Sequence, residues 1–219
     1  MLIIFDLDGT LINTISDLGQ ACNYALHKCG FPTHPIEDYP RLVGNGINRL
    51  IQRALPTEHQ DEATVLRVRE EFVPYYDEHN CDLTHPYDGI PELLSLLRQQ
   101  GHLLAVASNK YQAATEKIVA QLFPGIFHIV LGERENIPRK PDPQIVYDIH
   151  LMLHIDATPS PQCLYIGDSL VDADTARAAG TTLALCTWGF GTEQQMKDAA
   201  PDYLVHHPSE IAQIVQQLV

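Results

Sequence analysis

Carboxylates stand directly after two apolar runs of the sequence. Asp6 and Asp8 follow Leu2–Phe5, and Asp168 follows Leu164–Gly167. Residues two apart on an extended backbone face the same side, so Asp6 and Asp8 would present both carboxylates together. Unpaired carboxylates are costly to hold together, and a divalent cation with oxygen ligands relieves that cost. Because Mg²⁺ takes one or two protein carboxylates and leaves its other positions to water and substrate oxygens, the pattern predicts a magnesium site.

Groups that suit a phosphate accompany these carboxylates. Gly9 lets the chain turn so that backbone amides can approach an anion, and the hydroxyls of Thr10 and Ser108 can hydrogen-bond to it. Asn109 follows Ser108, and Lys140, in the segment RKPDP, supplies a positive charge. These residues predict a site for a phosphoryl group beside the metal.

The elements that must position these residues are expected to be strands of one parallel sheet. Short apolar runs, mostly continuous as in strands buried on both faces, lie at Leu2–Leu7, Leu103–Ser108, His128–Leu131, Leu164–Gly167, Thr182–Thr187 and Tyr203–Val205. Ligands of such sheets bind beyond the carboxyl ends of the strands, where these chemical groups stand. The pattern predicts an α/β, Rossmann-like core.

Helical patterns alternate with the runs. Asp88–Gln100 has Asp88 as its expected N-cap, Pro91 in its first turn and Gly101 as its stop, and Leu170–Ala179 ends before a glycine in the same way.

Residues 15–83 interrupt this rhythm. They offer amphipathic helix patterns at Asp17–Lys28, Asn45–Leu55 and Asp61–Tyr76, and no strand pattern; Pro74 leaves the end of the third helix open. We therefore expect a helical domain of residues 15–83, inserted into a core domain of residues 1–14 and 84–219.

Composition limits the partners. The 219 residues carry a formal net charge of -14, from 28 acidic and 14 basic residues, so the overall field repels nucleic acid and anionic membranes. No apolar stretch approaches the roughly 20 residues of a membrane helix, and Leu2–Phe5 is too short for a signal peptide. The five cysteines contain no CxxC pair. We expect a cytoplasmic protein, monomer or homodimer, with a small-molecule partner.

Four segments together resemble the motifs of the haloacid dehalogenase superfamily, in its order. They are DLDGT at Asp6–Thr10, SN at Ser108–Asn109, KPDP at Lys140–Pro143 and GDSLVD at Gly167–Asp172. The helical insert stands between the first and second motifs, where this family places a C1-type cap. The resemblance implies a central strand order of 5-4-1-2-3 and a cap that closes over the substrate.

The resemblance also implies roles. Asp6 would attack phosphorus and form an aspartyl phosphate, while Asp8 would protonate the leaving oxygen and later activate water. Mg²⁺ would be held by the Asp6 carboxylate, the Asp8 backbone carbonyl and Asp168, with Asp172 orienting that shell or coordinating through water. Ser108 and Lys140 would bind the phosphoryl oxygens, helped by amides near Leu7, Gly9 and Asn109. The implied enzyme is a magnesium-dependent phosphatase.

Other members of the superfamily remain as alternatives. The dehalogenase branch lacks the second acid, so Asp8 excludes carbon–halogen cleavage. The phosphonate-cleaving branch needs a cap lysine, and the only one, Lys28, stands near the predicted end of a helix, which does not favour that role. Sugar-phosphate mutases share all four motifs and the cap type. A non-catalytic regulatory protein is disfavoured by the intact set of Asp6, Asp8, Lys140 and Asp168.

The segment Arg41–Leu55, RLVGNGINRLIQRAL, is similar to the corresponding stretch of phosphoglycolate phosphatases. A glycine-bracketed turn leading into a helix would present amides and Arg49 towards the non-phosphate end of a substrate. Asn13 departs from the aspartate that is common after the DGT turn, which bears on the hinge between core and cap. The eleven histidines include His150 and His154 at i, i+4 on a predicted helix, but without a HExxH pattern we expect no zinc site there.

Overall fold

The structure, a computed structural model, describes residues 1–155 and 162–219. The chain forms two compact units, one made of Met1–Ile12 with Pro86–Val219 and the other of Asn13–His85. We call them the core unit and the inserted unit.

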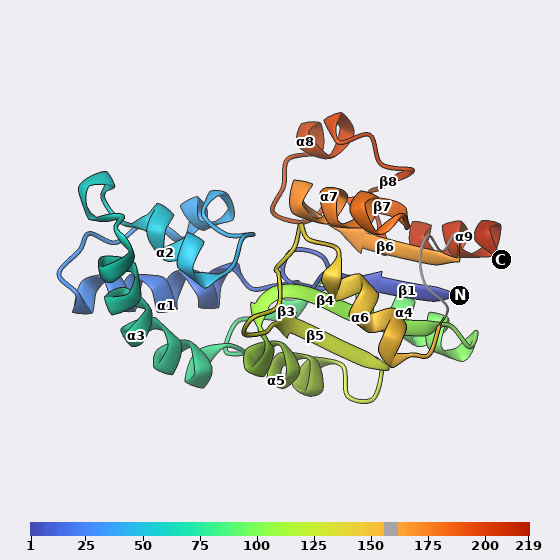
Figure 1. The fold of residues 1–219 in the computed structure, drawn as a ribbon, viewed down its shortest axis with the longest axis horizontal. Helices are drawn as coiled ribbons and strands as arrows, with labels where there is room; N and C mark the ends of the chain where they lie inside the picture. The colour runs from blue at the N-terminus through green and yellow to red at the C-terminus, as the bar shows by residue number, and fades with distance from the viewer. Residues whose placement is uncertain (156–161) are drawn as a thin grey trace. The chain divides into compact units, whose positions relative to one another are not determined.

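The chain alternates strands and helices along most of its length (Figure 1). The elements are β1 (Leu2–Phe5), β2 (Ile12–Asn13), α1 (Ile15–Lys28), the 3-10 helix η1 (Ile36–Arg41), α2 (Ile47–Ala54), η2 (Thr57–His59), α3 (Glu62–His79), β3 (His85–Pro86), α4 (Ile90–Gln99), β4 (Leu103–Tyr111), α5 (Gln112–Leu122), β5 (Ile129–Glu133), α6 (Gln144–Met152), β6 (Cys163–Gly167), α7 (Leu170–Ala179), β7 (Thr182–Cys186), α8 (Glu193–Asp198), β8 (Tyr203–Val205) and α9 (Pro208–Leu218).

The core unit is built on a six-stranded parallel sheet in the order β5-β4-β1-β6-β7-β8. When only the strands of this sheet are numbered, in chain order and starting from the β8 edge, the order is 6-5-4-1-2-3. It contains the 5-4-1-2-3 order implied by the family resemblance, with β8 added at one edge. The predicted α/β fold is confirmed. Every residue of β1 and of β6 is buried, which explains why their sequences are continuously apolar.

The two faces of the sheet are covered by different helices. Alternate strand residues, including Ile4, Ala107 and Tyr165, share one hydrophobic core with buried residues of α6 and α7 and with Met196 of α8. Phe5 points to the other face, where it packs edge-on against Phe127, which in turn packs against the end of α5. Ile4 and Phe5, which are successive residues of β1, are therefore both buried, one on each face of the sheet.

Two helix boundaries differ from the sequence-based expectation. Asp88 is not the N-cap of α4, because Gly89 takes that position with a φ of 84°, a left-handed conformation that favours glycine. Pro91 does lie in the first turn, as predicted. The helix predicted at Asp61–Tyr76 continues through Pro74 to His79, and Asp61 caps its start by accepting from the Thr64 amide.

His154 lies outside helix α6. The helix ends at Met152, and His154 has a φ of 55°, so the expected i, i+4 pair with His150 does not form on one helix face. His150 itself is buried, with Nδ1 facing the Val146 carbonyl at 2.9 Å. The structure shows a local packing role for this histidine. No helix within the described ranges is long and apolar enough to cross a membrane.

In the inserted unit, α1 packs against α3, and α2 also packs against α3. The buried Asp17 of α1 accepts hydrogen bonds from the backbone amides of Leu83, at 3.0 and 3.1 Å to its two oxygens, and of Thr84, at 2.8 Å. At the start of α1 the side chain of Asn13 accepts from the Ile15 amide, which is the same turn that an aspartate would make. Asp17 therefore ties the last residues of the unit to its first helix.

We expect Asp17→Ala to destabilise the inserted unit by about 2–3 kcal/mol, because it removes a buried charged acceptor and leaves backbone amides unpaired. Urea unfolding followed by far-ultraviolet circular dichroism measures this as a lower midpoint. Asp38→Ala, which removes an exposed carboxylate paired with Arg41 in the same unit, is the control and should leave the midpoint almost unchanged. Equal midpoints for the two variants would contradict this account of Asp17.

Candidate active site

The site lies at one edge of the sheet, where β1 and β6 end and the last residues of β4 continue past them. Phe5 of β1 is in register with Val106 of β4 and with Ile166 of β6, and all three strands are parallel. The residues that follow these positions therefore emerge together. This register is what brings Asp6, Ser108 and Asp168 to one place although they are far apart in sequence.

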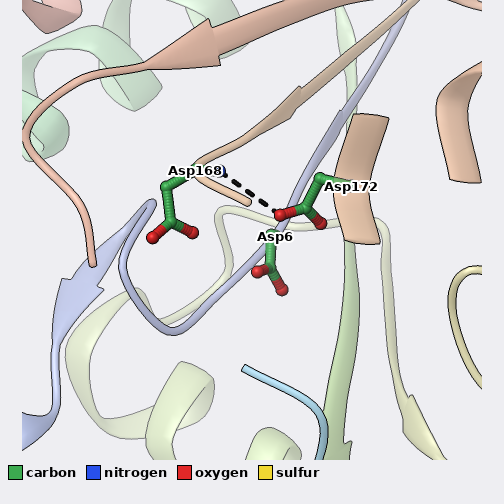
Figure 2. A group of neighbouring side chains, drawn as sticks. All are labelled: Asp6, Asp168 and Asp172. Atoms are coloured by element: carbon green, nitrogen blue, oxygen red, sulfur yellow. Dashed lines mark hydrogen bonds between the residues drawn. The ribbon is translucent and has the colours of Figure 1, made fainter. Parts of the chain in front are cut away.

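Three carboxylates meet at this edge. Oxygen atoms of Asp6, Asp168 and Asp172 all lie within 4.8 Å of one another, and Figure 2 shows the three side chains converging from β1, the end of β6 and the start of α7. Asp172 is fully buried, and Asp168 and Asp6 are only 2% and 8% exposed. Three buried carboxylates this close form a ready set of hard oxygen ligands for a divalent cation.

Lys140 neutralises part of this charge. Its ammonium lies 2.9 Å from Oδ1 of Asp6 and 2.8 Å from Oδ1 of Asp172, and it also donates to the Ala107 carbonyl at 2.9 Å. The hydroxyl of Tyr165 lies 3.1 Å from the same ammonium and donates to Asp172 at 3.2 Å. The lysine is thus held by two acids, a carbonyl and a phenol in a buried network.

The backbone of Lys140 is held by Asn109. The Asn109 amide nitrogen donates to the Lys140 carbonyl at 3.1 Å, and its oxygen accepts from the Lys140 amide at 3.0 Å. The following bond, Lys140–Pro141, is cis. The Asn109 side chain therefore positions the loop that carries the lysine, while phosphate binding by the backbone amide near Asn109 stays a prediction.

Asp168 lies in a close-fitting cradle. Its oxygens accept from the Thr10 hydroxyl at 3.2 Å and from the Phe190 amide at 2.7 Å. A Cβ added to Gly9, which has a φ of 89°, would lie 2.2 Å from Asp168 Oδ2, and one added to Gly189 would lie 2.3 Å from the same side chain. Only glycine fits at these two positions while Asp168 keeps its place.

Asp172 belongs to the first turn of α7. One of its oxygens accepts from the amide and the hydroxyl of Ser169, at 3.1 and 2.5 Å, as part of a capping box, and from the Asp168 amide at 3.3 Å, the dashed line of Figure 2. Its other oxygen faces Lys140 and Tyr165. These contacts hold Asp172 in place beside Asp168, and its implied role, orienting the metal's ligands or coordinating through water, stays a prediction.

Asp8 faces a second lysine. The ammonium of Lys110 lies 3.0 Å from Asp8 Oδ2, and the Lys110 amide donates to the Ser108 hydroxyl oxygen at 3.1 Å. Asp8 Oδ1 is buried and makes no hydrogen bond to any described residue. That oxygen therefore has an unused capacity for hydrogen bonding at the site.

Burial and mutual repulsion shift the acids of the cluster. Desolvation raises the pKa of Asp6 well above its ordinary value, the charges of Asp172 and Asp168 raise it further, and Lys140 opposes them. Desolvation and the charge of Asp172 likewise raise the pKa of Asp168 from 3.8 to about 7. Burial by itself lowers the pKa of Lys140, but Asp172 and Asp6 outweigh it and raise that pKa above its ordinary value.

The cluster fits the metal that the sequence predicts. Asp6 and Asp168 provide buried carboxylate oxygens, and burial together with the charge of Asp172 raises the pKa of Asp168 although Lys140 opposes the shift. The glycine cradle keeps Asp168 in place without filling the space around its oxygens with side chains. Hard oxygen donors of this kind suit Mg²⁺.

Sequence reasoning missed Lys110, Tyr165 and the Phe190 amide. Lys110 directly follows Ser108–Asn109, and a basic residue after two predicted phosphate ligands was a usable signal. Tyr165 sits inside a continuous apolar run, where nothing in the sequence says which face it takes. Arg49, predicted to bind substrate, belongs to α2 of the inserted unit, where its exposed side chain donates to Gln52 at 2.6 Å.

Residues 3–186 match the family described as haloacid dehalogenase-like hydrolase. The chain is 33% identical over 222 residues to the phosphoglycolate phosphatase of Mannheimia succiniciproducens, covering 98% of this chain and 97% of the relative. It is 30% identical over 207 residues to that of Aliivibrio fischeri, covering 92% and 90%.

Solved structures agree. A crystal structure of a protein from Lactobacillus delbrueckii subsp. bulgaricus has a TM-score of 0.91 at 33% identity, covering 98% of this chain and 97% of that one. A predicted phosphoglycolate phosphatase from Haemophilus somnus has a TM-score of 0.88 at 29% identity, with the same coverage. The chain therefore belongs to the haloacid dehalogenase-like hydrolase family, and it is a phosphatase.

Proposed function

We propose that this phosphatase hydrolyses small phosphomonoesters with Mg²⁺, through a phosphoryl group carried on Asp6, and that phosphoglycolate is its substrate. The observation that carries the proposal is the buried carboxylate of Asp6, held 2.9 Å from Lys140 at the edge of the carboxylate cluster, with a second acid two residues away. The names of the curated relatives support the substrate.

In the first step, an Asp6 oxygen forms a bond to phosphorus while the bond from phosphorus to the ester oxygen breaks. Asp8, protonated, gives its proton to that departing oxygen, so the alcohol leaves neutral. Lys140 stays beside Asp6 and offsets negative charge on the transferring group, while Ser108 and the backbone amides of the DGT turn bind its oxygens.

In the second step, Asp8 takes a proton from water as the water oxygen attacks phosphorus. The bond between phosphorus and Asp6 breaks, which releases inorganic phosphate and restores both aspartates to their starting states. One acid thus serves as proton donor and then as acceptor.

Asp6, Asp168 and the backbone carbonyl of Asp8 would hold Mg²⁺, and Asp172 would orient that shell. When bound, the cation neutralises charge on the phosphoryl oxygens. We further propose that residues 15–83 act as a cap over the core of residues 1–14 and 84–219, excluding water and supplying specificity groups such as Arg49.

Asp6→Asn is expected to lower kcat/KM for phosphoglycolate by at least about 10³-fold, because the amide is a poor nucleophile. Phosphate release in Mg²⁺ and in EDTA, over a panel of phosphomonoesters, measures it. The control Asp174→Asn changes an exposed aspartate of α7 and should retain full activity. Equal activity of Asp6→Asn and the wild type would remove Asp6 as the nucleophile.

Asp8→Asn is expected to slow hydrolysis of alkyl phosphates by about 10²–10⁴-fold, because the leaving alkoxide then receives no proton. p-Nitrophenyl phosphate, whose leaving group departs without a proton, should lose far less in its first step. Single-turnover rates on both esters make the comparison. Equal losses on both would mean that Asp8 is not the proton donor.

The metal-free protein is expected to lose thermal stability as pH rises from about 4 to about 7. The pKa of Asp168 is raised from 3.8 to about 7, so the folded protein binds this proton more tightly than the unfolded chain and is destabilised when it is lost. Mg²⁺ competes with that proton and should raise the Tm more at pH 8 than at pH 5.5.

Thermal unfolding in EDTA and in Mg²⁺ across this pH range provides the measurement. Asp168→Asn should flatten the metal-free profile and abolish most of the rise caused by Mg²⁺. A metal-induced rise that is the same at both pH values, or that persists in Asp168→Asn, would place the cation elsewhere.

A further inference from the structure

A second buried lysine, Lys110, contacts a different acid of the site from Lys140. The Lys110 side chain is 4% exposed and lies 3.0 Å from Asp8 Oδ2, whereas the Asp8 side chain is 21% exposed. Lys140 instead contacts Asp6 and Asp172. The two cations therefore accompany different acids, one at the nucleophile and the other at the proton donor.

The backbone of Lys110 is fixed from several directions. Its amide donates to Ser108 Oγ at 3.1 Å, and its carbonyl accepts from the Thr115 hydroxyl at 3.1 Å. A Cβ on Gly132 would lie 2.5 Å from that carbonyl oxygen, so glycine is needed there for the two strands to approach. A side chain on such a rigid base presents its charge at a defined point, as a binding group must.

The position of the Lys110 ammonium determines which part of a substrate it can contact. In the proposed reaction the ester oxygen must come within hydrogen-bond reach of the Asp8 carboxyl, about 3 Å. Since the Lys110 ammonium is 3.0 Å from Oδ2 of the same carboxyl group, that oxygen lies within roughly 8 Å of the ammonium, even when it contacts the other carboxyl oxygen. The next atoms of the substrate beyond the ester oxygen belong to its leaving alcohol, so a group on that alcohol can come within reach of the Lys110 ammonium, which contacts the proton donor.

We propose that Lys110 binds an anionic group on the leaving alcohol, a carboxylate carried on the carbon next to the ester oxygen. A lysine suits this task because its ammonium is a compact point charge. A carboxylate on the carbon next to the ester oxygen supplies the opposite charge. Lys110 then determines specificity, distinguishing substrates with an acidic alcohol from neutral esters of the same size. This inference rests on the proposed function and adds to it a residue of the core unit that selects the substrate.

The test compares phosphoglycolate with ethyl phosphate, which has the same number of carbons and no carboxylate. Lys110→Met should lower kcat/KM for phosphoglycolate by about 10- to 100-fold, the worth of one charge-assisted hydrogen bond, and that for ethyl phosphate by less than about 3-fold. Lys110→Arg should restore part of the loss. Because both esters require Asp8, ethyl phosphate reports any damage to Asp8 or to the fold.

A matched control and a binding measurement separate the possible failures. Lys197→Met removes an exposed lysine paired with Glu193 and should change neither ester. Calorimetric binding of phosphoglycolate to Asp6→Asn, with and without Lys110→Met, tests recognition without turnover, and the second change should weaken binding about 10-fold or more.

Equal losses on both esters would assign Lys110 to positioning Asp8 and overturn the proposal, as would unchanged kinetics. Wild-type turnover of ethyl phosphate with no preference for phosphoglycolate would overturn this inference while the phosphatase mechanism stood. A wild type inactive on both esters in Mg²⁺ would overturn the proposed function itself, and in that case loss of phosphoglycolate binding on Lys110→Met would still support the carboxylate contact.

Discussion

The constraint on which this structure depends is the burial of like charges at the carboxyl ends of adjacent strands. Four acids and two lysines gather where β4, β1 and β6 end, namely Asp6, Asp8, Asp168, Asp172, Lys110 and Lys140. Burying charge is tolerable only when each group is paired and hydrogen-bonded. The two lysines leave an excess of negative charge, and desolvation by burial together with that charge raises the pKa values of Asp6 and Asp168. A divalent cation would complete the compensation.

Many details of the neighbouring backbone follow from that constraint. The backbone packs directly against the acids at three glycines, where a Cβ would collide with Asp168 or Asp172. They are Gly9, Gly167 and Gly189. Asn109 holds the loop of Lys140, and Ser169 with the first turn of α7 holds Asp172. These residues need not touch a substrate to matter, because a displacement of the acids or of the lysine would unbalance the whole cluster.

Much of this could be predicted from the sequence, because its strongest signals are local. A continuous apolar run followed by an acid marks a buried strand and its functional end, and parallel register then collects those ends at one edge. Asp88 was wrongly expected to cap α4, since a left-handed glycine cap gives no side-chain signal distinct from a turn. Pro74 did not end α3, because tertiary packing of Phe72 and Tyr76 in the same helix outweighs the loss of one backbone bond.

Lys110 and Tyr165 escaped prediction for a different reason: their roles come from pairing across the fold. Tyr165 reads as one more apolar strand residue until its hydroxyl is seen between Lys140 and Asp172. Lys110 reads as an ordinary lysine until β4 places its ammonium against Asp8. In a protein with a net charge of -14, an anionic substrate is attracted only by local cations, so each buried lysine carries more of the recognition than the overall charge suggests. Because Lys140 already contacts the nucleophile and Asp172, the contact proposed for the remainder of an acidic substrate is assigned to Lys110, beside the proton donor, together with the groups proposed for the cap.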